Sequence, residues 1–455
     1  MSIQEWSQKA AKIWEVAWQR GGYLPKGFVQ HAALLTTANL VTAGLQLVQG
    51  VIVARLLGPS QYGIIALVVN YVGILYLLLE ARTAEGSTKY LAEFDATAKR
   101  ELALAVCKLG YVIDLAISTI VFLLVLATGW WAEKNIVKVE GTLPLIVLYG
   151  AALIPRSLKA TSYASLTVSG RFRTIGWLQI AGTTVQVVAI LLFLTSGFGV
   201  AGVIYGYFVE ALFSGLLYTV IAHRIIQSRW GGSWLNGSWG KLRGRYREIF
   251  RFYVLTDFNV LIQTVLTSLD VTIIGFFRTP TEAGYYKLAK TTAESINLVI
   301  NPLRAVIYPE MSRSMHTGDR SMSLRWGLQL SAQIGLPIAL FATLLVGAAP
   351  VLMPLAFGEK FIPSVFAFQG IAIAWIINSV FWWLRSCYYS AGLVGQWSVI
   401  VLVADVVALA LWLILTPRLG YLAVAWTWPL LAALSHGMAI YRYIRTVQGT
   451  SRSRG

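Results

Sequence analysis

Four polar side chains recur along one face of an otherwise apolar segment near the start of the chain. They are Asn39, Thr42, Gln46 and Gln49, in the run NLVTAGLQLVQG. At about 100° per residue, they share an arc of roughly 80° on a helix. Polar groups are costly in hydrocarbon, so the stripe predicts the wall of a water-filled cavity, which is a site for binding and not for catalysis. The alternative is hydrogen bonding to neighbouring helices, at well under about 2 kcal/mol per contact.

A second stripe repeats this pattern later in the chain. It consists of Asn259, Gln263, Thr267 and Asp270, in the run DFNVLIQTVLTSLD. These side chains again fall within about 80° of a helix. An internal repeat pairs the last residue of each stripe, Gln49 and Asp270. Two related stripes favour a cavity shared by two halves of the protein over incidental packing.

Three charged side chains follow on the next predicted helix, namely Lys287, Lys290 and Glu294. Their spacing of i, i+3 and i+7 places them on one face. Intramembrane lysine and glutamate are functional candidates, because a charge facing lipid is energetically expensive. The alternative is that Lys287 extends to the outer surface and that Glu294 only pairs with Lys290.

Four acidic residues within apolar segments are candidates for binding a coupling proton or sodium ion. They are Asp114, Glu210, Asp270 and Asp405. The alternative for each is an ion pair or hydrogen bond inside a helical bundle.

Asn378, Trp382 and Arg385 occur at i, i+4 and i+7 in a later segment. This set has the groups needed to stack on and bind a sugar diphosphate. Its predicted depth, close to the inner membrane interface, favours instead an aromatic belt with an arginine that extends to the headgroups.

The composition indicates which elements position these side chains. Of the 455 residues, 57% are hydrophobic and 13% are charged, with a mean hydropathy of +0.65. Such values are typical of a polytopic membrane protein. Apolar blocks of about 20 residues, enough for a helix to cross the bilayer, occur near residues 31–54, 62–81, 102–128, 143–166, 172–195, 200–222, 252–277, 284–308, 324–347, 364–388, 397–416 and 420–442.

The basic residues that give the net charge of +17 are distributed unevenly among the loops between these blocks. With the N-terminus inside, most lysines and arginines fall on one set of loops, as the positive-inside rule requires. We therefore expect cytoplasmic N- and C-termini and attraction to membrane lipid, and no nucleic-acid partner. The two cysteines, Cys107 and Cys387, indicate neither a disulfide framework nor a zinc site. No metal or cofactor is predicted.

An internal repeat organises the chain. ARLLGPSQYGIIALV, from Ala54, aligns with GFFRTPTEAGYYKLA, from Gly275, and two further matches share the same shift of about 221 residues. The chain is therefore predicted to be an all-α polytopic membrane protein of about twelve transmembrane helices, in two six-helix lobes related by a parallel repeat around a central cavity. The predicted divisions are an amphipathic interfacial helix (1–30), an N-lobe (31–222), a basic cytoplasmic linker (223–251), a C-lobe (252–445) and a disordered basic tail (446–455).

Four segments of the sequence resemble the oligosaccharide flippases. They are VARLLGPSQYGIIALV, LLLEARTAEGSTKYLAE, LDVTIIGFFRTPTEAGYYKLA and INPLRAVIYPEMSR. These flippases belong to the multidrug/oligosaccharidyl-lipid/polysaccharide exporter superfamily, and the similarity covers most of residues 31–445. The resemblance implies a flippase that moves a polyprenyl-diphosphate-linked oligosaccharide from the cytoplasmic to the outer leaflet, for cell-surface polysaccharide synthesis. It also implies basic cavity residues that meet the diphosphate, for which the matching positions are Arg55, Arg82, Lys287, Lys290 and Arg304.

The resemblance implies a monomer in the bacterial cytoplasmic (inner) membrane, working beside a polymerase or glycosyltransferase. Two other functions remain open. The first is a cation-coupled exporter of small drugs, whose cavity is expected to be rich in acids where this chain has lysines. The second is a membrane-embedded polymerase or glycosyltransferase, which normally shows a large outer loop or a catalytic carboxylate motif.

Overall fold

A computed structural model describes residues 26–81, 83–255, 258–296 and 326–452, together with Ile300, Ile307, Met311 and Ser312. Within these residues every regular element is a helix. Eight of these helices are long and apolar enough to cross a membrane, or up to nine if a bent pair counts as one span. The chain is thus an all-α multi-pass membrane protein. Most of the predicted interfacial helix at 1–30 lies outside the described residues.

The chain forms two compact units. The first contains residues 1–53, 75–130 and 141–258, and the second contains residues 54–74, 131–140 and 259–455. Two short segments of the first sequence half therefore pack within the second unit. The two lobes around a shared cavity remain a prediction.

The first predicted span and the second are joined in a single element, α2 (Lys26–Leu79). The helix breaks at Gly58, whose φ of 75° lies in the left-handed region that glycine adopts readily. Pro59 follows at the first position of the second helix, where its missing N–H costs no hydrogen bond. The Gly-Pro pair therefore ends one helix and begins the next.

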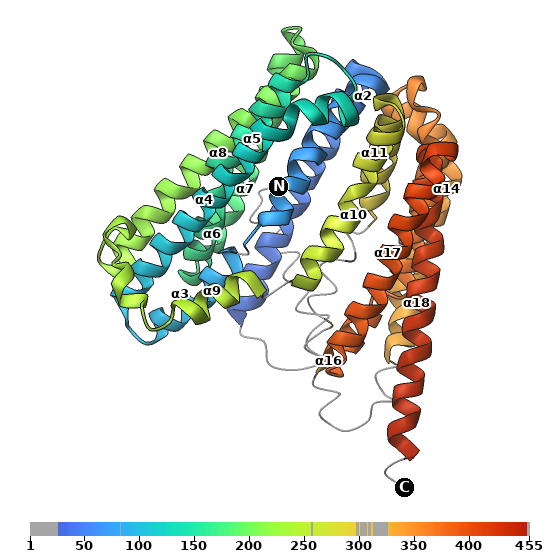
Figure 1. Ribbon diagram of the computed structural model, residues 1–455. Coiled ribbons are helices and arrows are strands. Elements are labelled where there is room, and N and C mark those ends of the chain that lie inside the picture. Colours follow the sequence, from blue (N-terminus) through green and yellow to red (C-terminus); the bar gives the residue numbers. More distant parts are fainter. Residues whose placement is uncertain are drawn as a thin grey trace. The chain divides into compact units, whose positions relative to one another are not determined.

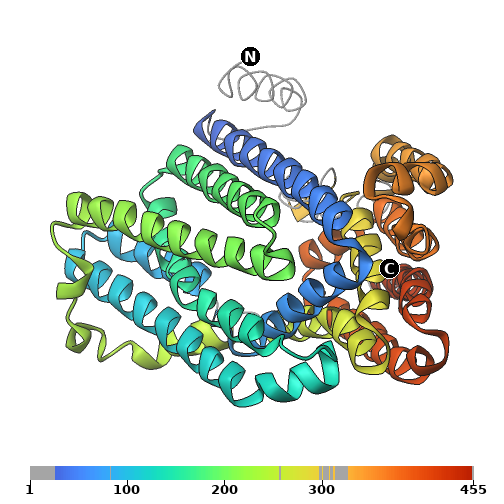
Figure 2. The same ribbon diagram turned by 90° about the horizontal axis from the view of Figure 1, so that it is seen from above.

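Six further helices of the first unit are α3 (Thr83–Ala96), α4 (Arg100–Ala132), α5 (Leu143–Ser157), α6 (Lys159–Val168), α7 (Phe172–Thr195) and α8 (Gly199–Trp230). A π-helical turn, η1 (Glu133–Val137), follows α4. Helix α8 packs along α7 and α5, and both views show α7 beside α8 (Figure 1 and Figure 2). Gly231, with a φ of 74°, ends α8 by donating its N–H to the carbonyl of Gln227.

The predicted linker is folded in part. Two 3₁₀ turns, η2 (Trp234–Asn236) and η3 (Trp239–Leu242), lead to α9 (Tyr246–Leu255). Tyr253 of α9 is buried against α3, where its hydroxyl lies 3.0 Å from that of Ser87. Asp95, at the end of α3, accepts two hydrogen bonds from Arg229, which hold the pKa of its carboxyl below the usual range.

The second unit contains α10 (Phe258–Phe277), α11 (Pro280–Glu294), α14 (Leu336–Phe357), α15 (Ser364–Val380), α16 (Leu384–Ser390), α17 (Val394–Leu419) and α18 (Tyr421–Arg452). Two short turns, η4 (Ser331–Gly335) and η5 (Glu359–Phe361), flank α14. Helix α18 packs against α15 and α17. It continues to Arg452, past the predicted boundary at residue 445.

Helices α15 and α16 are bent by 46° relative to each other. The bend is stabilised by side chains, because Ser331 donates to the carbonyl of Val380 at 2.6 Å and accepts from Trp383 Nε1 at 2.6 Å. The bend places Trp382 between two helical segments. The aromatic residues predicted to form an interfacial belt here are instead largely buried, with Trp382 only 3% exposed.

The GPxxYG segment after the first helix meets its repeat counterpart inside the second unit. A Cβ atom added to Gly63 would overlap the carbonyl of Pro280, and one added to Gly284 would overlap the carbonyl of Pro59. The contact is reciprocal, because the glycine of each repeat copy meets the proline carbonyl of the other copy. Only glycine allows the two backbones to approach this closely.

We expect Gly284→Ala to destabilise the protein by about 1–3 kcal/mol, because the added methyl group meets backbone that cannot rotate away. Gly347→Ala in α14 is the matched control, since a Cβ there meets nothing within 4 Å. It should be neutral or stabilising, as alanine favours helix. Thermal unfolding of both variants in detergent checks this. Equal melting temperatures would show that the crossing tolerates a side chain.

Candidate functional site

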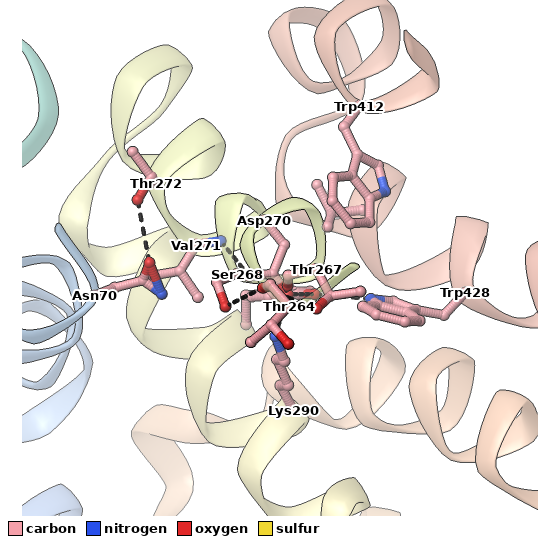
Figure 3. Close-up of polar contacts among 12 residues, drawn as sticks. Asn70, Thr264, Thr267, Ser268, Asp270, Val271, Thr272, Lys290, Trp412 and Trp428 are labelled. Carbon is pink, nitrogen blue, oxygen red and sulfur yellow. Dashed lines mark hydrogen bonds and ion pairs between the residues drawn. The ribbon is translucent and has the colours of Figure 1, made fainter. Parts of the chain in front are cut away.

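A buried carboxylate with several hydrogen-bond donors lies in the second unit. Asp270 of α10 is fully buried, and its Oδ2 accepts hydrogen bonds from Tyr286 Oη at 2.6 Å and Lys290 Nζ at 2.5 Å. Trp428 of α18 extends the network by donating Nε1–H to the Tyr286 hydroxyl at 2.9 Å. Lys290 and Trp428 approach Asp270 from two different helices (Figure 3).

This network is electrically compensated. Lys290 also donates to the backbone carbonyl of Thr267 at 3.3 Å, and its ammonium lies 5.7 Å from the centre of the Trp428 ring. The lysine was predicted to share a face with Glu294, but its ion pair is with Asp270. A buried charge needs an oppositely charged partner, because without one nothing offsets the free-energy cost of removing it from water.

Trp428 and Thr267, which contact this network, also line a cavity of about 330 Å³. Helices α10, α15, α16, α17 and α18 all contribute to its wall, which belongs entirely to the second unit. The polar and aromatic lining residues are Thr267, Trp375, Asn378, Phe381, Trp382, Arg385, Trp397, Asp405, Trp412, Trp428, Ser435 and His436. Asn378, Trp382 and Arg385, which the sequence placed on one helical face, thus share one cavity.

Two charges of opposite sign line this cavity. Asp405 lies on α17, and its Oδ2 is buried without a hydrogen-bond partner among the described residues. Arg385 of α16 is exposed and lies over the ring of Tyr389, 5.0 Å from its centre. The Nδ1 atom of His436 lies 2.7 Å from the carbonyl of Ala432. The cavity therefore offers one cation and one carboxylate beside aromatic surface.

The other two acidic candidates have partners in the first unit. Asp114 accepts hydrogen bonds from the hydroxyls of Thr83 and Thr161, and from the Thr161 backbone N–H at 3.3 Å. Glu210 pairs with Lys159 at 3.1 Å and also accepts from Ser214. Among the four acidic candidates, Asp405 alone keeps a buried oxygen without a described partner. No cluster of His, Cys, Asp or Glu in the described residues is arranged to hold a metal ion.

The first polar stripe is divided between surface and interior of its own unit. Asn39 and Gln46 are exposed, and Thr42 is half-buried. Gln49 is 6% exposed, and its Oε1 accepts from Gln186 Nε2 of α7 at 2.9 Å. The hydrogen bond at Gln49 agrees with the packing alternative, while the exposed amides keep the cavity prediction open.

The remaining candidates differ in what the structure shows. Arg55 donates to the carbonyls of Leu355 and Ala356, so it caps the C-terminal end of α14. Lys287 and Glu294 are half-buried on α11. The side chains of four candidates fall outside the described residues, and these are Arg82, Asn259, Gln263 and Arg304.

Sequence reasoning missed most of the aromatic lining of the cavity. Trp397, Trp412 and Trp428 were not recognised, and neither was Tyr286 as a partner of Asp270. A usable signal was present for Trp428, because it lies inside the apolar block 420–442, just before Pro429. Tryptophan at membrane interfaces is expected near the ends of such blocks.

The sequence model of the family described as polysaccharide biosynthesis protein matches residues 28–315. No curated protein sequence matches the chain significantly.

Among solved structures, the chain is similar to an inward-facing multidrug resistance MATE family transporter of the MOP superfamily, with a TM-score of 0.65 and 14% identity over 97% of this chain and 99% of that one. It is similar to the lipid II flippase MurJ, with a TM-score of 0.69 and 11% identity over 91% and 87% of the two chains. It is also similar to the Vibrio cholerae MATE transporter VcmN, with a TM-score of 0.57 and 13% identity over 98% of each chain. The fold is thus that of the MATE transporters and of MurJ, and the chain belongs to the polysaccharide biosynthesis protein family.

Proposed function

We propose that this protein is a flippase that translocates a polyprenyl-diphosphate-linked oligosaccharide from the cytoplasmic to the outer leaflet of the bacterial inner membrane. The family match and the transporter fold support transport in polysaccharide biosynthesis. The observation that carries the proposal is the cavity of about 330 Å³, which sets Arg385 and Asp405 among tryptophans inside a membrane-embedded bundle. Polar groups in such a bundle are characteristic of a transport pathway.

The chemistry of the proposed cargo fits these groups. A diphosphate needs a cationic partner, and a guanidinium binds phosphate oxygens with paired N–H donors. Arg385 is exposed, so its guanidinium is available to an anion. The prenyl chain is as apolar as the bilayer and needs no polar path. Alternating access then moves the headgroup while the prenyl chain stays in lipid. The protein works as a monomer beside a polymerase or glycosyltransferase, with both termini in the cytoplasm.

Transport of a lipid-linked sugar across vesicles tests this proposal. The purified full-length protein is reconstituted into liposomes with undecaprenyl diphosphate carrying a fluorescent oligosaccharide, and accessibility of the sugar to an added enzyme is followed with time. We expect faster loss of protection than in protein-free liposomes. Unchanged protection, together with protein-dependent efflux of a cationic dye, would favour the drug-exporter alternative.

We expect Arg385→Gln to slow this translocation by about tenfold or more, because it removes a charged donor that a diphosphate would engage. Arg418→Gln is the matched control, since Arg418 is an exposed arginine of α17 that does not line the cavity. It should leave the rate unchanged. If the two variants transport equally well, the diphosphate is bound elsewhere.

A further inference from the structure

The cavity of the second unit is unusually rich in tryptophan. Five of the 17 tryptophans in the chain line it, namely Trp375, Trp382, Trp397, Trp412 and Trp428. An aromatic face carries partial negative charge and attracts the weakly positive C–H groups of a ligand. Pyranose rings present rows of such C–H groups on their faces, with hydroxyls around their edges. The wall therefore suits a sugar ring better than it suits a fully apolar or a strongly anionic ligand.

Two polar atoms in the wall lack a hydrogen-bond partner among the described residues. Trp382 is 3% exposed, and its Nε1–H donates to no group among the described residues. Asp405 Oδ2 accepts from none of them either. The neighbouring Trp383 shows the contrast, because its Nε1 donates to Ser331 at 2.6 Å. Buried polar groups are almost always hydrogen-bonded, so this donor and this acceptor point to a ligand.

The ligand must satisfy both atoms at once. Asp405 needs a donor, and Trp382 needs an acceptor. A metal cation or an ammonium group would serve Asp405 but would leave the Trp382 N–H without an acceptor, and Arg385 in the same wall would oppose it. Hydroxyl groups both donate and accept. A sugar ring carries several hydroxyls around its edge, so it can supply both a donor and an acceptor while its C–H face lies on an indole ring.

The size of the cavity limits how much sugar it can hold. About 330 Å³ lies at the lower end of the range of roughly 300–1,000 Å³ for pockets that enclose small ligands. This is enough for one or two pyranose rings and too little for a complete lipid-linked repeat unit.

We infer that this cavity is a monosaccharide subsite, in which Trp382 Nε1–H donates to one sugar hydroxyl and Asp405 accepts from another. This inference rests on the proposed function and names the part of the cargo that the cavity recognises. Arg385, exposed in the same wall, lies where the diphosphate joined to that sugar would find a cation. Recognition then depends on the first sugar of the glycan.

Binding of two matched lipids tests the subsite. The full-length protein in nanodiscs is titrated with undecaprenyl diphosphate and with undecaprenyl diphosphate glucose, and dissociation constants are measured by microscale thermophoresis. The variants are Trp382→Phe, which keeps an aromatic ring but loses the N–H, and Asp405→Asn, which keeps the shape but loses the charge. Trp426→Phe is the control, because Trp426 lies on α18, packs against the ring of Phe366 and does not line the cavity.

The wild type should bind the glucose-bearing lipid more tightly than the sugar-free one. Each cavity variant should weaken binding of the glucose-bearing lipid by about tenfold, the effect of losing a hydrogen bond to a charged or buried group, and leave the sugar-free lipid unaffected. Equal weakening of both lipids, no weakening, or a defect that depends on sodium concentration would each overturn the subsite. Translocation by these variants at the wild-type rate would also overturn it while leaving the flippase proposal standing. Failure of the wild type to translocate any lipid-linked sugar would instead remove the proposed function.

Discussion

Replacing Lys290 with methionine should destabilise the protein by roughly 3–5 kcal/mol, because it leaves the Asp270 carboxylate buried without its cation. Asp270 is fully buried, and the side chain of Lys290 is only 13% exposed, so water cannot take the place of the ammonium. Tyr286 would remain as a neutral donor to Oδ2. A change in the free energy of unfolding, measured by SDS titration in mixed micelles, checks the prediction.

Two further variants separate the ion pair from other roles of Lys290. The double change Asp270→Asn with Lys290→Met removes both charges, so it should recover most of the lost stability. Lys287→Met is the matched single variant one turn away on α11, where the lysine is half-buried and has no ion pair among the described residues. It should be nearly neutral for stability. A double variant as unstable as Lys290→Met alone would show that the lysine acts through something other than Asp270.

The ion pair also changes how the charged face of α11 is interpreted. The spacing of Lys287, Lys290 and Glu294 predicted three side chains on one helical face. Lys290 forms an ion pair with Asp270, whereas Lys287 forms no ion pair with any described residue. Slower translocation by Lys287→Met at normal stability would therefore report on cargo, whereas the same result for Lys290→Met would first report on folding.

Periodicity and repeats predicted the helical elements well, because both depend on local sequence. The Gly-Pro break at Gly58 falls between the predicted spans at 31–54 and 62–81. Predicted spans at 102–128 and 172–195 correspond to α4 and α7. Hydropathy and repeat length carry this information, since each span must match the bilayer thickness.

The partners of polar side chains were much harder to predict, because they lie far apart in the sequence. Asp114 and Thr161 are 47 residues apart, and Gln49 and Gln186 are 137 apart. A helical face gives the direction of a side chain but not the helix that it meets. Asp405 and Arg385 appeared in the sequence as separate candidates for this reason, although they line one cavity. Trp382 was assigned to the interface because hydropathy places a residue along a helix without showing whether it faces lipid or core.

Replacing Asp114 with alanine should destabilise the first unit by about 3 kcal/mol or more, since three buried donors would lose a charged acceptor. Asp114 is 4% exposed and accepts from the hydroxyls of Thr83 and Thr161 and from the Thr161 backbone N–H. That N–H lies in the first turn of α6, where Leu158 provides no side-chain cap. The Asp114 carboxylate of α4 therefore caps the N-terminus of a different helix, α6. Its negative charge interacts favourably with the positive end of the α6 dipole.

This capping role predicts a pattern that ion coupling does not. Asp114→Asn keeps an acceptor for one threonine hydroxyl, so it should recover part of the stability that alanine loses, and its translocation should follow its stability. Thr83→Val removes only one of the three hydrogen bonds to Asp114 and leaves no buried donor unpaired. It should therefore lower the free energy of unfolding less than Asp114→Ala does. The measurements are SDS unfolding and the liposome assay on the same preparations. A fully stable Asp114→Asn that no longer responds to a proton or sodium gradient would show instead that this carboxylate binds the coupling ion, because a helix cap has no reason to sense either gradient.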